Sequence, residues 1–370
     1  MRIGLISPPW IPVPPPAYGG IEAVVDVLAR GLVAAGHEVL LAAPSDSTCP
    51  VPRVPGLHPS QPERLGETAP ELRHVVQAYA AMTDVDIVHD HTVAGPLFAH
   101  RPARPIAVTT MHLPVKYEMA ELYRAMSKDV AVVAISHHQA ASAWGLQVAR
   151  VIHHGLDVVD IPVGTGTGGY ACFLGRMHPS KGVREAILIA RRAGVPLRIA
   201  GKMIEPREKK YFRDYIAPLL GSDAEYVGEL GAAEKYELLG GAIALVNPIA
   251  WPEPFGLVMI ESLATGTPVL STHQGSAPEL VDHGVTGYLR NDIEGLADAL
   301  GRVGELDRTK CRQVAETRFT TARMVADHIS LYADLLARRA ASPTPGPRVP
   351  PLHLTRPSSP VAGQPSMSTV

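Results

Sequence analysis

Residues 251–270 read Trp-Pro-Glu-Pro-Phe-Gly-Leu-Val-Met-Ile-Glu-Ser-Leu-Ala-Thr-Gly-Thr-Pro-Val-Leu, and this stretch decides how the rest of the chain is interpreted. Apolar residues between Leu257 and Ala264 recur at helical spacing, which predicts a helix. Glu253 precedes this helix in a Pro-rich loop, whereas Glu261 lies within it. One acid is therefore expected beside the start of the helix and the other on its surface.

The start of this helix is a predicted anion site. The first N–H groups of a helix have no partner inside it, and the helix dipole adds to their attraction for negative charge. We expect the amides of Phe255, Gly256 and Leu257 to hold a phosphate. Glu253 would then contact the group that the phosphate carries, and Glu261 would accept from a hydroxyl. For two isolated acids, the ordinary interpretation is a helix cap and a solvated carboxylate.

The motif Glu-Pro-Phe-Gly-Leu-Val-x-x-Glu, followed by Ala-x-Gly-x-Pro-Val, resembles the signature of the retaining glycosyltransferases of family 4, or glycosyl transferases group 1. The resemblance implies an α/β protein of GT-B architecture. Two Rossmann-like parallel-sheet domains would face a cleft, and a C-terminal helix would cross back to the first domain. It also implies an enzyme that transfers a sugar from a nucleotide diphosphate sugar to a hydroxyl acceptor and retains the anomeric configuration.

The composition of the 370-residue chain fits two domains with cores of their own. A net charge of −2 gives no electrostatic reason to bind nucleic acid or a membrane surface. The three cysteines are scattered, which argues against a disulfide framework and a thiolate metal cluster. The apolar start at Ile3 is stopped by Pro8 and Pro9, so it is too short for a signal peptide or a membrane span. We expect a cytoplasmic enzyme, with peripheral membrane contact left open.

Residues 1–43 predict a strand, a loop, a helix and a second strand, which form a βαβ unit of a parallel sheet. The loop ends in Gly19 and Gly20, beyond the carboxyl end of the first strand, where such sheets bind ligands. A simple turn is the ordinary alternative. The resemblance implies that both glycines pass close to the donor diphosphate or the acceptor.

His112 follows a predicted strand over residues 106–110 and should lie on the ligand side of the sheet. A single histidine is more often structural than catalytic. In the resembled family, a histidine in this Thr-x-His setting faces the transferred sugar, so His112 is predicted to position the donor. His154 stands where that family usually has asparagine. Residues 44–70 have no clear period and predict a long surface loop that could border the acceptor.

The second domain opens with a predicted strand and the pattern Gly-Arg-x-x-x-x-Lys-Gly, which contains Arg176 and Lys181. Both side chains can reach one diphosphate, although such a pair alone is usually solvated. The pattern resembles the family's diphosphate clamp, whose charges would stabilise the leaving phosphate. Gly201 follows a further strand and should face the same crevice. The resemblance also implies that one loop borders the nucleotide base. This loop consists of Gly228, Glu229 and Leu230.

Domain boundaries follow from composition and from the resemblance. Residues 1–158 are the predicted acceptor-side domain, residues 159–169 a Gly- and Thr-rich linker, and residues 170–320 the domain that binds the nucleotide sugar. Residues 321–340 are the predicted returning helix. The Pro- and Ser-rich residues 341–370 should be disordered.

Three patterns suggest other sites and are set aside. The Asp-x-Asp at Asp84 looks like a metal motif of another glycosyltransferase architecture, and the His-Asp-His at residues 89–91 could be drawn as a metal site. A position at the sheet edge explains them, so we expect no metal and no cofactor besides the donor substrate. The Gly-x-Gly-x-x-Gly match at residues 164–169 precedes a strand rather than a helix, so its context is wrong for dinucleotide binding.

The predicted catalytic residues are Glu253, His112, Arg176 and Lys181, with Glu261 on the ribose. UDP is favoured over GDP, and the acceptor is a hydroxyl of a glycan, a glycolipid or a natural product. The alternatives are a sugar-nucleotide epimerase or a phosphorylase of the same fold, or a non-catalytic nucleotide-sugar-binding protein.

Overall fold

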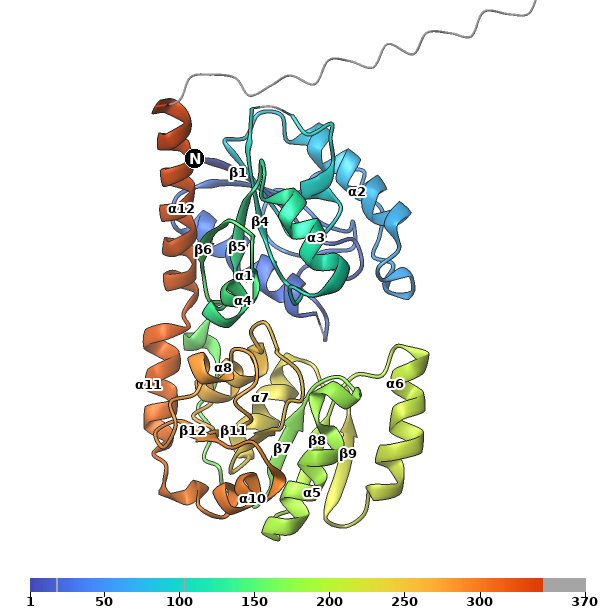
Figure 1. Cartoon of the computed structure of the whole chain (residues 1–370), viewed down its shortest axis with the longest axis vertical. Helices are drawn as coiled ribbons and strands as arrows, with labels where there is room; N and C mark the ends of the chain where they lie inside the picture. The colour runs from blue at the N-terminus through green and yellow to red at the C-terminus, as the bar shows by residue number, and fades with distance from the viewer. Residues whose placement is uncertain (18, 103, 342–370) are drawn as a thin grey trace, which may run out of the picture.

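The computed structural model describes residues 1–17, 19–102 and 104–341, which form two domains stacked along the long axis (Figure 1). Each domain is built on a six-stranded sheet, with orders β2-β1-β3-β4-β5-β6 and β12-β11-β10-β7-β8-β9. Neighbouring strands in both sheets are parallel. The predicted α/β class with two Rossmann-like sheets is confirmed. In the described part of the chain, no helix combines the length and apolar character needed to cross a bilayer.

The N-terminal sheet contains the strands that the sequence predicts within residues 1–43 and over residues 106–110. Its strands are β1 (Arg2–Ile6), β2 (Glu38–Ala42), β3 (Ile87–Asp90), β4 (Ile106–Thr110), β5 (Ala131–Ala134) and β6 (Val148–Val151). Its helices are α1 (Gly20–Ala34), α2 (Thr68–Ala81), α3 (Tyr117–Met126) and α4 (His137–Ser142). Ile3 and Leu5 of β1 are fully buried, as expected for a parallel sheet that helices cover on both faces.

The C-terminal sheet repeats this architecture. Its strands are β7 (Ala171–Leu174), β8 (Leu197–Ala200), β9 (Ala224–Gly228), β10 (Leu245–Asn247), β11 (Val269–Ser271) and β12 (Gly287–Leu289). Its helices are α5 (Val183–Ala193), α6 (Pro206–Tyr211), α7 (Ala232–Gly241), α8 (Leu257–Ala264), α9 (Ala277–Leu280), α10 (Ile293–Gly301) and α11 (Arg308–Arg318). Helix α10 ends at Gly301, and a 3-10 turn at Val303–Glu305 follows it.

Helix α12 (Thr321–Ala341) returns to the N-terminal domain and packs against α1, as predicted (Figure 1). Its residues Met324, Leu331 and Tyr332 are buried in the N-terminal core. The close approach depends on Gly31 of α1, because a Cβ there would lie 2.5 Å from Cγ2 of Val325. The predicted disordered tail lies outside the described residues except for Ala341, which is helical.

The predicted surface loop over residues 44–70 is wrong in part. Val51, Val54 and Leu57 are buried, and α2 already begins at Thr68. The backbone of this segment pairs with β2, since Val54 N–H donates to the carbonyl of Leu41 at 2.9 Å. Its apolar side chains are too widely spaced to give a periodic signal, yet they pack into the N-terminal core.

The Gly-rich residues 159–169 are attached to the C-terminal domain rather than free. The N–H groups of Gly164, Gly166 and Gly168 donate to the carbonyls of Thr265, Gly240 and Gly241, each at 2.9 Å. The absence of side chains lets the two backbones touch, because a Cβ on Gly164 would lie 2.1 Å from the Cα of Gly240. The high glycine content of residues 159–169 therefore reflects close packing of their backbone against the C-terminal domain.

The chain crosses between the domains twice, and the two crossings are bonded to each other. Leu156 N–H donates to the carbonyl of Phe319 at 2.8 Å, and Thr321 N–H donates to the carbonyl of Leu156 at 2.9 Å. Gly155 allows this contact, since a Cβ there would lie 2.4 Å from the carbonyl oxygen of Thr320.

Replacing Gly31 by alanine should lower the free energy of unfolding by roughly 1–3 kcal/mol, because the added methyl overpacks the α1–α12 contact. The stiff, β-branched Val325 cannot easily move away. Urea unfolding followed by circular dichroism measures the change. The matched control is Gly301→Ala in α10, where a Cβ meets nothing within 4 Å and should stabilise by up to about 1 kcal/mol. Equal stability of the two variants would contradict this account.

Candidate active site

Helix α8 starts where the sequence predicts, at Leu257. Gly256 is its N-cap and has a left-handed conformation with φ 88°, which favours glycine. Met259, Ile260 and Leu263 bury one face of the helix in the C-terminal core. The amides of the first turn, which remain without partners inside the helix, are thereby fixed at a defined point.

The N-terminus of α8 meets the N-terminus of α1 where the two domains touch. A Cβ on Gly20 would lie 3.4 Å from Cδ1 of Leu257. Gly19 is packed tightly within its own domain, because a Cβ there would lie 2.6 Å from Cβ of Pro15. The glycines predicted to approach a ligand therefore lie beside the predicted anion site.

The loop that carries Glu253 is fixed by the segment after β11. Ser276 N–H donates to the carbonyl of Glu253 at 3.1 Å, and the Ser276 hydroxyl donates to the carbonyl of Phe255. Gly275 lets this segment approach, because a Cβ there would lie 2.3 Å from the carbonyl oxygen of Glu253. The Glu253 carboxylate accepts from Nε1 of Trp251 at 2.7 Å. Its position is thus set by contacts on both sides.

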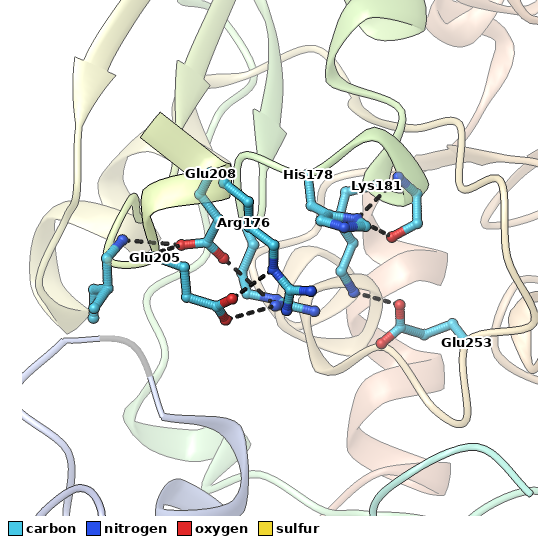
Figure 2. Close-up of polar contacts among 9 residues, drawn as sticks. Arg176, His178, Lys181, Glu205, Glu208 and Glu253 are labelled. Atoms are coloured by element: carbon cyan, nitrogen blue, oxygen red, sulfur yellow. Dashed lines mark hydrogen bonds and ion pairs between the residues drawn. The ribbon is translucent and has the colours of Figure 1, made fainter. Parts of the chain in front are cut away.

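Lys181 and Glu253 form an ion pair between the loop after β7 and the loop after β10 (Figure 2). Their side chains are only 15% and 14% exposed, so neither charge is solvated freely. The Lys181 ammonium also lies 5.2 Å from the ring centroid of Trp251, within the range of a cation–π contact. The structure therefore brings together a predicted phosphate ligand and a predicted sugar ligand.

Arg176 reaches the opposite way from the same loop, toward two carboxylates of the α6 region (Figure 2). Its Nη1 lies 3.4 Å from Oε1 of Glu208 and 3.8 Å from Oε1 of Glu205. Glu208 is fully buried and also accepts from the N–H of Ile204 at 2.9 Å, so it is a rigid anchor for the guanidinium. Sequence reasoning missed both acids, because nothing in their local pattern links them to Arg176.

Glu261 pairs with Lys235 of the neighbouring helix α7, with 2.5 Å between Nζ and Oε1. The Glu261 side chain is 13% exposed. Sequence reasoning missed Lys235, which lies far from Glu261 in the chain. The lysine holds the carboxylate at one place on the α8 surface.

The loops after β8 and β9 pack beside the loop that carries Arg176. Gly201 N–H donates to the carbonyl of Gly228 at 2.9 Å, and Gly201 accepts from the Tyr226 hydroxyl at 2.7 Å. A Cβ on Gly201 would lie 1.9 Å from the carbonyl oxygen of Gly175. Gly228 has φ 95°, and the predicted base-edging loop continues with the exposed Glu229 and the half-buried Leu230.

His112 lies in a row of histidine rings that leads to the α8 loop. Its Nε2 lies 2.9 Å from Nδ1 of His91, and its ring centroid lies 5.7 Å from that of His154. The His154 ring in turn lies 4.9 Å from the ring of Phe255. Burial lowers the pKa of His112 to about 3, so the imidazole is neutral at physiological pH. The structure places His112 near the Glu253 loop, as its predicted role requires.

Two family models match the chain. Residues 165–318 match the model described as glycosyl transferases group 1, and residues 18–160 match the model described as Glycosyltransferase Family 4. The chain belongs to these glycosyltransferases. The two matches together account for both domains and place the Arg176, Glu253 and Glu261 motifs inside the first of them.

Relatives of this glycosyltransferase share most of its length. A phosphatidyl-myo-inositol mannosyltransferase of Mycolicibacterium smegmatis is 26% identical over 355 residues, which cover 85% of this chain and 88% of the relative. The crystal structure of AviGT4, a glycosyltransferase involved in avilamycin A biosynthesis, is 28% identical with a TM-score of 0.68 and covers 91% of this chain and 98% of its own. A crystal structure of Anabaena Alr3699/HepE in complex with UDP and glucose has a TM-score of 0.71 at 18% identity, covers 90% of this chain and 99% of its own, and shares the fold. The predicted GT-B fold is confirmed.

Glu22 is a buried acid of this glycosyltransferase that sequence reasoning did not select. It lies in the first turn of α1 beside Gly19, whose Cβ would be 3.0 Å from Oε2 of Glu22. Burial raises the pKa of Glu22 to about 7, and the charge of Lys202 from the other domain partly opposes this rise. A carboxyl that changes charge near neutral pH therefore lies where the two domains meet.

Glu279 of α9 joins the domains directly. Its carboxylate accepts from the N–H groups of His137 and His138 at 2.8 Å and 2.7 Å, and it contacts Nε2 of His153 at 2.8 Å. One atom each of His137, His153 and Glu279 lie within 4.8 Å of one another, a donor set that suits zinc. Because two backbone N–H groups and the His153 imidazole already bind the Glu279 carboxylate, the role of Glu279 is the contact between the domains.

The His-Asp-His at residues 89–91 does not converge on a common point. His89 and His91 stack with ring centroids 4.3 Å apart, as expected for residues on one face of a strand. Asp90 lies apart from them and accepts from the hydroxyls of Tyr79 at 2.9 Å and Thr92 at 2.7 Å. These contacts hold the Asp90 carboxylate in a separate direction from the two stacked imidazoles.

Buried histidines make the stability of the fold depend on pH. Burial lowers the pKa of six of them, namely His74, His89, His91, His112, His154 and His328. Below about pH 6.5 the unfolded chain therefore binds more protons than the folded chain, and stability falls as pH falls. Burial has the opposite effect on three acids, whose raised pKa favours the folded state below neutral pH: Glu22, Glu71 and Asp90. The histidines outnumber the acids, so their effect prevails.

We expect the free energy of unfolding to decrease between about pH 7.5 and about pH 5.5, by up to about 1.4 kcal/mol per pH unit for each histidine. Urea unfolding at the two pH values measures this decrease. His328→Asn should weaken the dependence because a buried titrating group is lost, whereas the exposed His58→Asn should leave it unchanged. Equal or higher stability at the lower pH would refute the assignment of these histidines as neutral.

Proposed function

We propose that this glycosyltransferase transfers a sugar from a UDP-sugar to a hydroxyl of its acceptor and retains the anomeric configuration. The observation that carries the proposal is the Lys181–Glu253 pair beside the N-terminus of α8. A cation, free helix amides and a carboxylate are the groups that a sugar diphosphate needs. Arg176 comes from the same loop as Lys181 (Figure 2), and Glu261 lies on α8 itself.

The proposed donor pose assigns one chemical group to each part of the site. Lys181 and Arg176 bind the diphosphate, and the amides from Phe255 to Leu257 bind its outer phosphate. Glu253 accepts from hydroxyls of the sugar, and Glu261 from those of the ribose. The base lies along Gly228 to Leu230, and His112 contacts the sugar from the N-terminal domain. HepE, whose fold the chain shares, was solved with UDP, which makes UDP the first nucleotide to test.

Donor binding would exchange ion pairs rather than create them. Phosphate oxygens would take over Lys181 from Glu253, and they would compete with Glu205 and Glu208 for Arg176. Each cation keeps an anionic partner throughout, so the desolvation of the buried charges is compensated in both states. The Glu253 carboxylate, released from Lys181, would then accept from a sugar hydroxyl.

The proposed reaction needs no protein nucleophile. The bond between the anomeric carbon and the phosphate oxygen breaks, and the bond to the acceptor oxygen forms on the same face. The acceptor proton passes to the departing phosphate. Catalysis then comes from positioning and from the stabilisation of charge on the leaving diphosphate by Arg176 and Lys181, without a required metal.

The proposed acceptor is a hydroxyl of a glycan, a glycolipid or a natural product. The relatives act on different molecules, as their names show for phosphatidyl-myo-inositol and for avilamycin A biosynthesis. Helix α3 carries Glu118 and Glu121 as well as Arg124, so it is not a basic surface for anionic lipid headgroups.

Lys181→Ala and Glu261→Ala should each reduce sugar transfer by at least roughly 100-fold, because one removes a charge from the diphosphate and the other a contact to the ribose. The rate of release of free nucleoside diphosphate with a set of acceptors measures the effect. Circular dichroism and thermal unfolding should show that both variants remain folded.

The matched controls are Lys209→Ala and Glu237→Ala, which remove exposed charges from the same domain. They should transfer sugar at the rate of the unmodified enzyme. Turnover near that rate in either site variant would count against the proposal. Nucleoside diphosphate release that needs no acceptor would instead indicate an epimerase or a hydrolytic activity.

Isothermal titration calorimetry should show tighter binding of UDP than of GDP, and Lys181→Ala should weaken both through the loss of a diphosphate contact. Uridine, which has no phosphate, is the control and should bind weakly to every variant. Preference for GDP would contradict the proposed base while leaving the proposed diphosphate site intact.

A further inference from the structure

We propose that His91 is a positioning residue that fixes the tautomer of His112, so that His112 offers an N–H donor from Nδ1. The catalytic consequence rests on the proposed function, in which His112 contacts the donor sugar. The tautomer itself rests only on the geometry of the two rings.

A single hydrogen bond connects the imidazoles of His91 and His112. Nδ1 of His91 lies 2.9 Å from Nε2 of His112, which is hydrogen-bond distance for two ring nitrogens. In such a bond one nitrogen donates and the other accepts, so the tautomers of the two neutral rings are linked. If His91 donates, His112 must carry its own proton on Nδ1. If His112 donates, the proton of His91 must lie on Nε2.

The surroundings of His91 favour the first arrangement. Its Nε2 is buried and has no hydrogen-bond partner among the described residues. A buried N–H without an acceptor is rarer in proteins than a buried acceptor without a donor. The proton of His91 is therefore placed on Nδ1, from which it donates to His112 and leaves a bare lone pair at Nε2.

Both rings are neutral, which the linkage requires. Burial lowers the pKa of His91 well below its usual value and that of His112 to about 3. Burial is the main cause, and a proton on His89, His154 or His328 would lower the pKa of His91 further by charge repulsion. Neither ring therefore gains a second N–H at physiological pH.

The His91 ring is held in place from the side of the C-terminal helix. His89 stacks on it with ring centroids 4.3 Å apart and an interplanar angle of 26°. His89 is itself fixed at both nitrogens, by the Tyr332 hydroxyl at 2.7 Å and the Thr110 hydroxyl at 2.8 Å. Rotation of His91 away from His112 would disturb this whole stack, so the geometry of the shared proton is stable.

His112 is left with one nitrogen for a ligand. Its Nε2 is used by His91, and His112 as a residue is more exposed than His91. The His154 ring separates it from Phe255, which follows Glu253 in the loop that is proposed to hold the sugar. An Nδ1–H at this place donates to a sugar oxygen, whereas the other tautomer would accept from a hydroxyl.

The test is a long-range ¹⁵N–¹H spectrum of the full chain labelled with ¹⁵N-histidine, in which the spectrum of His112→Asn identifies the His112 signals. We expect His112 to be protonated at Nδ1 and bare at Nε2. His91→Asn should keep this tautomer because an amide N–H can replace the donor, and His91→Leu should move the proton toward Nε2. A wild-type His112 protonated at Nε2 would overturn the inference, even if His91→Leu failed to fold.

Turnover supplies the second readout. His91→Leu should reduce kcat by roughly 10- to 100-fold, as for other partners that orient a functional histidine, while His91→Asn should stay within about 3-fold of the unmodified enzyme. KM for the acceptor should not change. An equal loss in both variants would show that His91 acts only through packing and would overturn its positioning role. If no variant transfers sugar but the spectra agree with expectation, the proposed function fails while the tautomer assignment stands.

Discussion

The ion pair between Lys181 and Glu253 is the interaction on which the site depends. The two residues belong to loops that leave the carboxyl ends of β7 and β10, which are neighbours in the C-terminal sheet. Parallel strands direct both loops to the same edge, so residues distant in sequence meet there. Because a half-buried charge is costly without a partner, the pair also sets the distance between the loops. Gly256 and Gly275 then allow the backbone to close around Glu253.

The C-terminal helix connects the architecture to the site in a second way. Tyr332 of α12 is fully buried in the N-terminal domain and contacts His89, which stacks on His91 beside His112. The residues of the N-terminal domain that face the α8 loop are thus supported by helix α12. This explains why a helix that follows the second domain packs as part of the first domain's core, and why its contact with Gly31 matters to the whole molecule.

The sequence predicted those features that depend on neighbours in the chain. Local patterns were sufficient for the start of α8 after Gly256 and for the loop that carries Lys181. Features that depend on distant partners were missed. Lys235 meets Glu261 only because α7 packs on α8, and Glu279 of α9 meets the N-terminal domain only because the two domains pack together. No local pattern reports such contacts, because they arise when the sheets assemble.

The paired crossings at Leu156 and Thr321 limit how the two halves of the molecule can move. A single flexible tether would let one half rotate freely with respect to the other. Two segments that share backbone hydrogen bonds resist twisting and sliding, so a bend with its axis at this ladder is the motion that they oppose least. Substrate entry and product exit would then follow this bend, whose axis lies near the α8 loop, because His154 beside the ladder contacts Phe255.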